Sequence, residues 1–173
     1  MYKHQWEVVQ AIHSLRERGM VIHLTLVGGG SGRAQKKLED AIAKYDPDKS
    51  FVETMPFIPH DSLPKLLANA DLFIFASSCE NLPVTLLEAM ASGLPIACSD
   101  RGPMPEVLQD GGIYFDPENA DTIATAVERL IVDETLRISV AKRAKILSEQ
   151  YSWSRCAAET WTFLIKVAES QKI

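Results

Sequence analysis

Short apolar segments alternate with helix-like segments along almost the whole chain. The segments 72–76 (Leu-Phe-Ile-Phe-Ala) and 94–98 (Leu-Pro-Ile-Ala-Cys) are apolar without a two-residue alternation, which is typical of strands covered on both faces of a parallel sheet. Between them, residues 84–92 have helical spacing and end at Gly93. This order predicts an α/β fold, with a three-layer, Rossmann-like open parallel sheet that carries helices on both faces.

The same patterns give an order of elements for the whole chain. Strands are expected at 21–27, 51–52, 71–76, 94–98 and 113–115, and helices at 3–18, 34–45, 62–69, 84–92, 105–108, 120–132, 135–149 and 154–170. We expect one domain, 1–173, with the C-terminal helices packing back on it. A doubly wound unit normally opens on a strand, and this chain opens on a helix, so we expect a first strand upstream of Met1.

Composition excludes several classes of protein. The formal net charge of -5 argues against a dedicated nucleic-acid binder. No apolar run approaches the roughly 20 residues that span a bilayer. The three cysteines Cys79, Cys98 and Cys156 have no CxxC spacing and are odd in number, which favours free thiols in a reducing, cytoplasmic compartment. No His, Cys and Asp cluster has the spacing of metal ligands.

A glycine-rich turn follows the strand expected at 21–27. The glycines Gly28, Gly29 and Gly30 precede Ser31-Gly32 and a helix, so backbone amides there can face an anion. The dinucleotide fingerprint needs a third glycine where Arg33 stands, which disfavours an adenine-dinucleotide site. From this turn alone, a diphosphate site and a simple tight turn are equally good interpretations.

Two glutamates lie on either side of the next expected helix start. Glu80 follows a strand and Glu88 comes eight residues later, inside the helix 84–92. The amides of Val84, Thr85 and Leu86 would point back toward the loop. A carboxylate accepts hydrogen bonds strongly from sugar hydroxyls. The alternative is a solvated acidic pair, which is the usual state of two glutamates at arbitrary spacing.

The residues around these glutamates resemble family-4 (group 1) retaining glycosyltransferases. Glu80 and Glu88 form the E-x7-E pattern of that family, and the run 88–95 (Glu-Ala-Met-Ala-Ser-Gly-Leu-Pro) is similar to its helix and following strand. Further landmarks match in the same order, and together they extend over essentially the whole chain: 26–30, 70–74, 105–107 and 111–117.

The resemblance implies an architecture and an activity. The family has the GT-B fold, and this chain resembles only its C-terminal, donor-binding domain, with the N-terminal acceptor domain upstream. The full-length protein would transfer a hexosyl-type group, with retention and without a metal or other cofactor, from a nucleotide-diphosphate sugar to a saccharide or lipid-linked acceptor. This would serve polysaccharide, lipopolysaccharide or glycolipid synthesis. UDP-sugar is the first choice of donor and GDP-sugar the second, and the isolated chain is expected to be inactive.

The resemblance also implies roles for particular residues. Glu80 and Lys3 would be catalytic, with Glu80 at the donor sugar and Lys3 neutralising the diphosphate leaving group. Glu88 would hold the ribose hydroxyls. Other donor contacts would come from the glycine turn, from the loop after Glu80 and from the turn that lines the base: Gly28, Gly29, Gly30, Asn81, Leu82, Val84, Thr85, Phe57, Ile58 and Pro59.

Two departures from the family pattern keep other functions open. Asn81-Leu82-Pro83 replaces the frequent Gly-Phe-Gly, and Pro83 has no amide hydrogen to donate. The arginine that usually precedes the lysine would fall upstream of Met1. The alternatives are a non-catalytic interaction module that keeps the fold, and a nucleotide-sugar epimerase of the same architecture.

The remaining conspicuous residues have structural interpretations. Trp6, Trp153 and Trp161 are expected in the core, and Cys79 is expected to be a small buried thiol. The four histidines are expected to be solvated or packed, although His60 adjoins the expected base turn. The basic cluster at 142–145 is expected to be a solvated helix face. Its second interpretation is contact with acidic lipid headgroups, which would associate the full-length protein with the inner face of the cell membrane.

Overall fold

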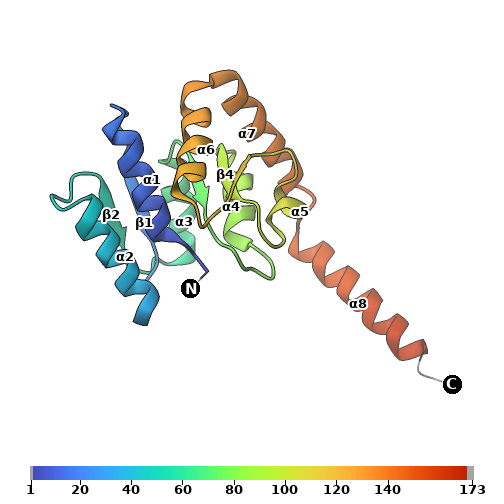
Figure 1. Ribbon diagram of the computed structural model, residues 1–173. Helices are drawn as coiled ribbons and strands as arrows, with labels where there is room; N and C mark the ends of the chain where they lie inside the picture. The colour runs from blue at the N-terminus through green and yellow to red at the C-terminus, as the bar shows by residue number, and fades with distance from the viewer. Residues whose placement is uncertain (1, 171–173) are drawn as a thin grey trace.

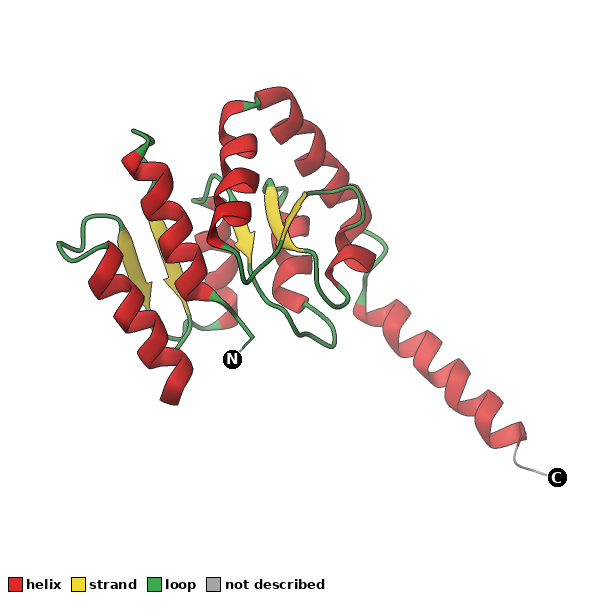
Figure 2. Cartoon of the chain, viewed as in Figure 1, coloured by secondary structure: helices red, strands yellow, loops and turns green. Residues whose placement is uncertain are grey.

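The chain forms two parallel sheets, here called the smaller and the larger half-sheet, with helices packed against them and on both faces of the larger one (Figures 1 and 2). The computed structural model describes residues 2–170. Strand β1 (Leu24–Val27) pairs with β2 (Val52–Met55), and the larger half-sheet has the order β3 (Phe73–Phe75), β4 (Ile96–Ser99), β5 (Ile113–Phe115). All three strand pairs are parallel. The predicted α/β fold with a parallel sheet is confirmed.

The helices follow the predicted order. They are α1 (Gln5–Glu17), α2 (Gly32–Tyr45), the 3-10 turn η1 (His60–Ser62), α3 (Leu63–Ala68), α4 (Val84–Ser92), α5 (Met104–Leu108), α6 (Ala120–Val132), α7 (Glu134–Ser148) and α8 (Trp153–Ser170). Strand β1 begins at Leu24 and not at the expected Val21, because Leu24, opposite Val52, is the first residue that pairs with β2. Val21 precedes that pairing and is exposed.

One core covers the first face of both half-sheets. Helix α1 packs between α2 and α6. Its buried side chains share a cluster with Leu24 and Leu26 of β1 and with Ala97 and Phe115 of the larger half-sheet. Within residues 2–170, β1 and β3 do not pair with each other. The common core therefore holds together two sheets that are not hydrogen-bonded to each other within the described residues.

A second core covers the other face of the larger half-sheet. Helices α4, α5 and α7 bury apolar side chains against β4, and Gly93, in the left-handed conformation, ends α4 as the sequence predicts. Its largest fully buried members are Leu86, Met90, Ile96, Met104, Leu108 and Leu147. The three-layer arrangement is thus complete around β4.

The connection from α2 to β2 depends on one buried carboxylate. Asp46 accepts hydrogen bonds from the backbone N–H groups of Ser50, Phe51 and Val52, at 2.7, 3.1 and 2.8 Å, and from the Ser50 hydroxyl. Burial raises the pKa of Asp46, but these hydrogen bonds outweigh it and hold the pKa below its ordinary value. The carboxylate fixes the loop that starts β2.

Helix α8 departs from the prediction. Helices α6 and α7 pack on the domain as expected, but α8 leaves it as a rod (Figures 1 and 2) and buries none of its residues. Trp153 and Trp161 are 78% and 67% exposed, so their predicted core positions are wrong. Their helical spacing indicates an apolar face, but spacing does not say what covers that face. In the described part of the chain, no helix has the length and apolar character to cross a membrane.

Candidate functional site

The predicted site residues gather around the carboxyl ends of the strands. The glycine turn follows β1, the turn 57–59 follows β2, and the loop 76–83 follows β3. Lys3 comes from the segment before α1, and Glu88 lies within α4. In an open parallel sheet, this edge is where ligands bind.

Lys3 and Glu80 lie in direct contact. The Lys3 ammonium donates to Oε1 of Glu80 at 2.5 Å, across 77 residues of sequence. The Glu80 side chain is mostly buried and Lys3 is half-exposed. The ammonium also lies 5.6 Å from the centre of the Phe75 ring at the end of β3. The fold therefore brings together the two residues for which the family resemblance implies catalytic roles.

Glu88 has a partner that the sequence analysis missed. Nε2 of His60 lies 2.5 Å from Oε1 of Glu88, and the two side chains are 77% and 24% exposed. His60 opens η1, directly after the expected base turn. Its place beside that turn was the only signal in the sequence, because nothing in the residue pattern pairs it with a helix 28 residues away.

The glycine turn offers unused backbone donors. Gly28, at a φ of 109°, donates its N–H to the carbonyl of Met55 at 3.1 Å, which ties the turn to β2. A positive φ of this size is readily adopted only by glycine. The N–H groups of Gly29 and Gly30 have no acceptor within residues 2–170. This geometry allows the turn to receive an anion.

The start of α4 differs from the expectation of several unused amides. Val84 donates to the carbonyl of Leu82 at 2.9 Å, and Leu86 donates to that of Pro83 at 3.0 Å. Of the three amides expected to be unused, only that of Thr85 has no acceptor among the described residues. Pro83 stands at the N-cap and turns the chain tightly, so backbone carbonyls take up the neighbouring donors.

Several apolar groups near the predicted site are open to solvent. Phe57 is strongly exposed, and Leu82 and Val84 are partly exposed. Cys79 is also exposed, so its predicted burial is wrong. The loop turns its side chain outward, whereas Ser77 on the same loop is buried. Small-molecule sites are lined mainly by apolar and aromatic side chains with a few polar groups, and these exposed side chains are available for such a lining.

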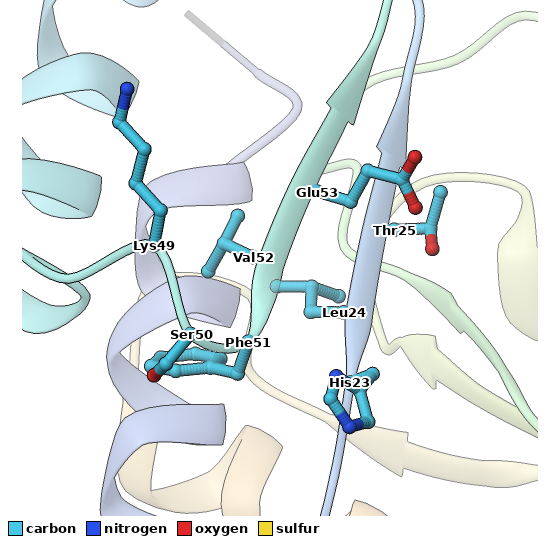
Figure 3. A pocket seen from close by; sticks show the side chains of 8 residues that line it. All are labelled: His23, Leu24, Thr25, Lys49, Ser50, Phe51, Val52 and Glu53. Carbon is cyan, nitrogen blue, oxygen red and sulfur yellow. The ribbon is translucent and has the colours of Figure 1, made fainter.

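A separate hollow lies at the opposite end of the smaller half-sheet (Figure 3). It is lined by residues at the starts of β1 and β2, among them His23, Lys49 and Glu53. Because parallel strands begin there, it faces away from the carboxyl edge and holds none of the predicted site residues. Within residues 2–170, no three His, Cys, Asp or Glu side chains are placed to hold a metal ion.

The basic cluster on α7 is partly used inside the domain. Arg143 donates to Oδ1 of Asp110 at 2.6 Å. Lys142 and Lys145 remain exposed. The cluster therefore presents fewer uncompensated charges than the sequence suggests.

Comparisons with known proteins agree on a family. A sequence profile described as "Glycosyl transferases group 1" matches residues 1–147. The chain is 33% identical over 156 residues to an uncharacterized glycosyltransferase, MJ1607, of Methanocaldococcus jannaschii, covering 88% of this chain and 39% of that protein. It is 29% identical over 177 residues to a GDP-mannose-dependent alpha-(1-6)-phosphatidylinositol monomannoside mannosyltransferase of Mycobacterium tuberculosis, covering 94% of this chain and 44% of that protein.

Solved structures agree on the fold. Alr3699/HepE of Anabaena, in complex with UDP and glucose, superposes with a TM-score of 0.80 at 22% identity, covering 93% of this chain and 45% of that one. The chain thus spans less than half the length of each of these three proteins.

Proposed function

The chain belongs to the group 1 family of glycosyl transferases and has the fold of GT-B glycosyltransferases, and on this premise we propose that it binds a nucleoside-diphosphate sugar as the donor domain of a longer retaining enzyme. That enzyme transfers a hexosyl group to an acceptor held by an upstream domain. One fact supports the division into domains: the chain covers less than half the length of these relatives.

One observation carries the proposal. Glu80 and Glu88, at the spacing of the family motif, each meet a side chain from a distant segment: Lys3 for the first and His60 for the second. The edge that holds them also presents the unused amides of the glycine turn. Carboxylates for hydroxyls, together with a cation and amides for phosphate, are the groups that a nucleotide sugar requires.

Each group has a part in the proposed reaction. Glu88 accepts hydrogen bonds from the ribose hydroxyls, and Glu80 contacts the donor sugar. Lys3, the glycine turn and the Thr85 amide stabilise the negative charge that develops on the departing diphosphate, in place of a metal.

The base of the donor has two candidates. UDP is our first choice, supported by the similar fold of a protein solved with UDP and glucose. GDP is the second, because a relative uses GDP-mannose. The turn Phe57, Ile58, Pro59 is proposed to line the base, since it leads directly into His60 at Glu88.

The acceptor side of the proposal rests on the relatives. One acts on a phosphatidylinositol monomannoside, which supports a saccharide or lipid-linked acceptor in polysaccharide, lipopolysaccharide or glycolipid synthesis. We place the enzyme in the cytoplasm, where Lys142 and Lys145 are available for peripheral contact with the inner face of the membrane.

Calorimetric titration of the 173-residue chain with UDP, GDP and ADP tests the donor site. We expect UDP or GDP to bind, and Glu88→Gln to weaken binding about tenfold or more, because a hydrogen bond to a charged group is lost. Glu134→Gln, an exposed glutamate in the first turn of α7, is the matched control and should bind like the parent chain.

Absence of binding by all three nucleotides at millimolar concentration, from a folded chain, would favour the interaction module instead. Equal binding by the Glu88→Gln variant and the parent chain would remove the glutamate from the site. Product analysis with the full-length protein separates transfer from epimerisation, and the isolated chain should form neither product.

A further inference from the structure

The segment Tyr2–His4 is fastened to the loop that carries Glu80. The carbonyl of Tyr2 accepts a hydrogen bond from the N–H of Ser78 at 2.7 Å. Nε2 of His4 lies 2.8 Å from the hydroxyl of the same serine. Lys3, between these two attachments, reaches Glu80. Ser78 therefore receives contacts from both sides of the residue that the proposed function assigns to the leaving group.

His4 adopts a backbone conformation that a residue of its size rarely takes. It lies at the N-cap of α1 with φ 41° and ψ 29°, in the left-handed region. That region is costly for residues with a side chain, and such residues keep it only where the surrounding structure imposes it. The conformation turns the chain between Lys3 and the helix.

The contacts of the His4 side chain explain how this conformation is held. His4 is 5% exposed, and its ring centre lies 5.4 Å from that of Trp6, tilted by 56°. Burial lowers the pKa of His4, while Glu118 and Glu7 act to raise it and Lys37 to lower it. The ring is thus neutral at neutral pH and adds no charge beside Lys3.

The Lys3–Glu80 pair does not fix its own geometry. Lys3 is half-exposed, and an exposed ion pair gains little because solvent screens it and two flexible side chains lose freedom. The hydrogen bond between His4 and Ser78 is short and part-buried, and it joins the same two segments. Together with the bond from the Ser78 N–H to the Tyr2 carbonyl, it holds the segment that carries Lys3 against the loop that carries Glu80.

We propose that His4 is a positioning residue, which acts through Ser78 to hold the Lys3 ammonium at Glu80 in the geometry that the donor diphosphate requires. His4 itself does not touch the donor. The expected effect on nucleotide binding rests on the proposed function. The positioning itself rests on the contacts among Lys3, His4, Ser78 and Glu80.

Nucleotide titration of variants tests the consequence. Ser78→Ala removes the hydroxyl that His4 contacts, and His4→Gly removes the ring while suiting the left-handed backbone. Each is expected to weaken binding of the preferred nucleotide about fivefold. Ser78→Thr keeps the hydroxyl and should restore binding. His13→Ala, on α1, loses only a ring contact with Tyr45 at the end of α2; it is the matched control and should leave affinity unchanged.

A double-mutant cycle separates positioning from a general loss of structure. In a Lys3→Ala background, Ser78→Ala should change affinity less than about twofold, because its effect passes through Lys3. A further fivefold loss in that background overturns the proposal. The proposal is also overturned if Ser78→Ala and His4→Gly bind the nucleotide as tightly as the parent chain does. If Glu88→Gln still weakens binding in that case, the proposed function stands although the positioning role fails.

A measurement that needs no nucleotide tests the positioning role even if the chain binds none of the three nucleotides. The Glu80 carboxyl carbon signal in NMR reports the Lys3 contact directly. Ser78→Ala should move this signal toward its position in Lys3→Ala, and Ser78→Thr should leave it in place. A signal that stays at the parent position in Ser78→Ala overturns the positioning role, whatever the outcome for nucleotide binding.

Discussion

Strand β4 in the larger half-sheet is buried from Ile96 to Ser99, whereas β1 in the smaller half-sheet buries only Leu24 and Leu26. Strand β2 has no fully buried residue. Helices cover both faces of β4, with α6 on one side and α5 and α7 on the other. The smaller half-sheet is held by a single core and by the polar contacts of Asp46.

The space around the glycines also differs between the two half-sheets. A Cβ added to Gly112, before β5, would lie 2.7 Å from the carbonyl oxygen of Ile96. A Cβ added to Gly29, after β1, would meet nothing within 4 Å. Close packing on both faces thus supports the larger half-sheet, whereas the smaller one depends on one core and on local hydrogen bonds. Gly28 and Gly29 of the glycine turn therefore have open space around them, whereas the start of β5 is closely packed.

The largest expected effect is a truncation inside the larger half-sheet. Ile96→Ala should lower the free energy of unfolding by about 4 kcal/mol, because it removes fully buried methyl groups and leaves a cavity. Urea denaturation followed by circular dichroism measures the change. Thr25→Ala, at an exposed position on β1, should cost less than about 0.5 kcal/mol. Equal losses at both positions would break the comparison.

The next effect tests the polar support of the smaller half-sheet. Asp46→Ala should cost about 3 kcal/mol, because three backbone N–H groups lose their acceptor. Since folding lowers the pKa of Asp46, its contribution is present above the ordinary pKa of about 4 and is lost as the pH falls through the folded value. The difference in urea stability between parent and variant should therefore shrink below about pH 4. Asp40→Ala, exposed on α2, is the control, and a difference that grows in acid would contradict the assignment.

A pair of glycine substitutions sharpens the contrast in packing. Gly112→Ala should cost about 2 kcal/mol, because the new methyl group overlaps the Ile96 carbonyl and Leu108. Gly29→Ala should stay within about 0.5 kcal/mol. Thermal unfolding of the two variants measures both. If the two melting temperatures fall equally, space around the glycines is not what distinguishes the half-sheets.

The smallest expected effect is on α8. Trp161→Ala should change the unfolding free energy by less than about 0.5 kcal/mol, because the side chain is 67% exposed on a helix that buries none of its residues. Trp6→Ala, its buried counterpart on α1, should cost about 3 kcal/mol. Urea denaturation of both variants provides the comparison. A loss of several kcal/mol for Trp161→Ala would mean that α8 packs on the domain after all.

Local patterns were sufficient for the elements and for much of the candidate site. The apolar runs predicted the strands at β3 and β4, and Gly93 predicted the end of α4. The motif spacing predicted that Glu80 and Glu88 bracket one helix start, and the order of strands put their loops at one edge. These features depend on residues near one another in sequence, where periodicity and turn chemistry are informative.

Contacts between distant segments were predicted less well. The pairing of His60 with Glu88 had no local signal, and the exposure of Cys79 depends on how one loop turns. The amides of Val84 and Leu86 were expected to be unused, but a tight turn at Pro83 satisfies them. Trp153 and Trp161 lie on an apolar helix face whose partner the helix itself does not specify.

The sequence by itself determined the kind of fold, the order of its elements and the spacing of the two glutamates, because each follows from side-chain periodicity and turn residues along a short stretch of chain. Only the tertiary structure decided that Lys3 meets Glu80 through a fastened Tyr2–His4 segment, that His60 meets Glu88, and that α8 stands away from the domain. Those outcomes depend on which surfaces become neighbours after folding, and packing in three dimensions sets that.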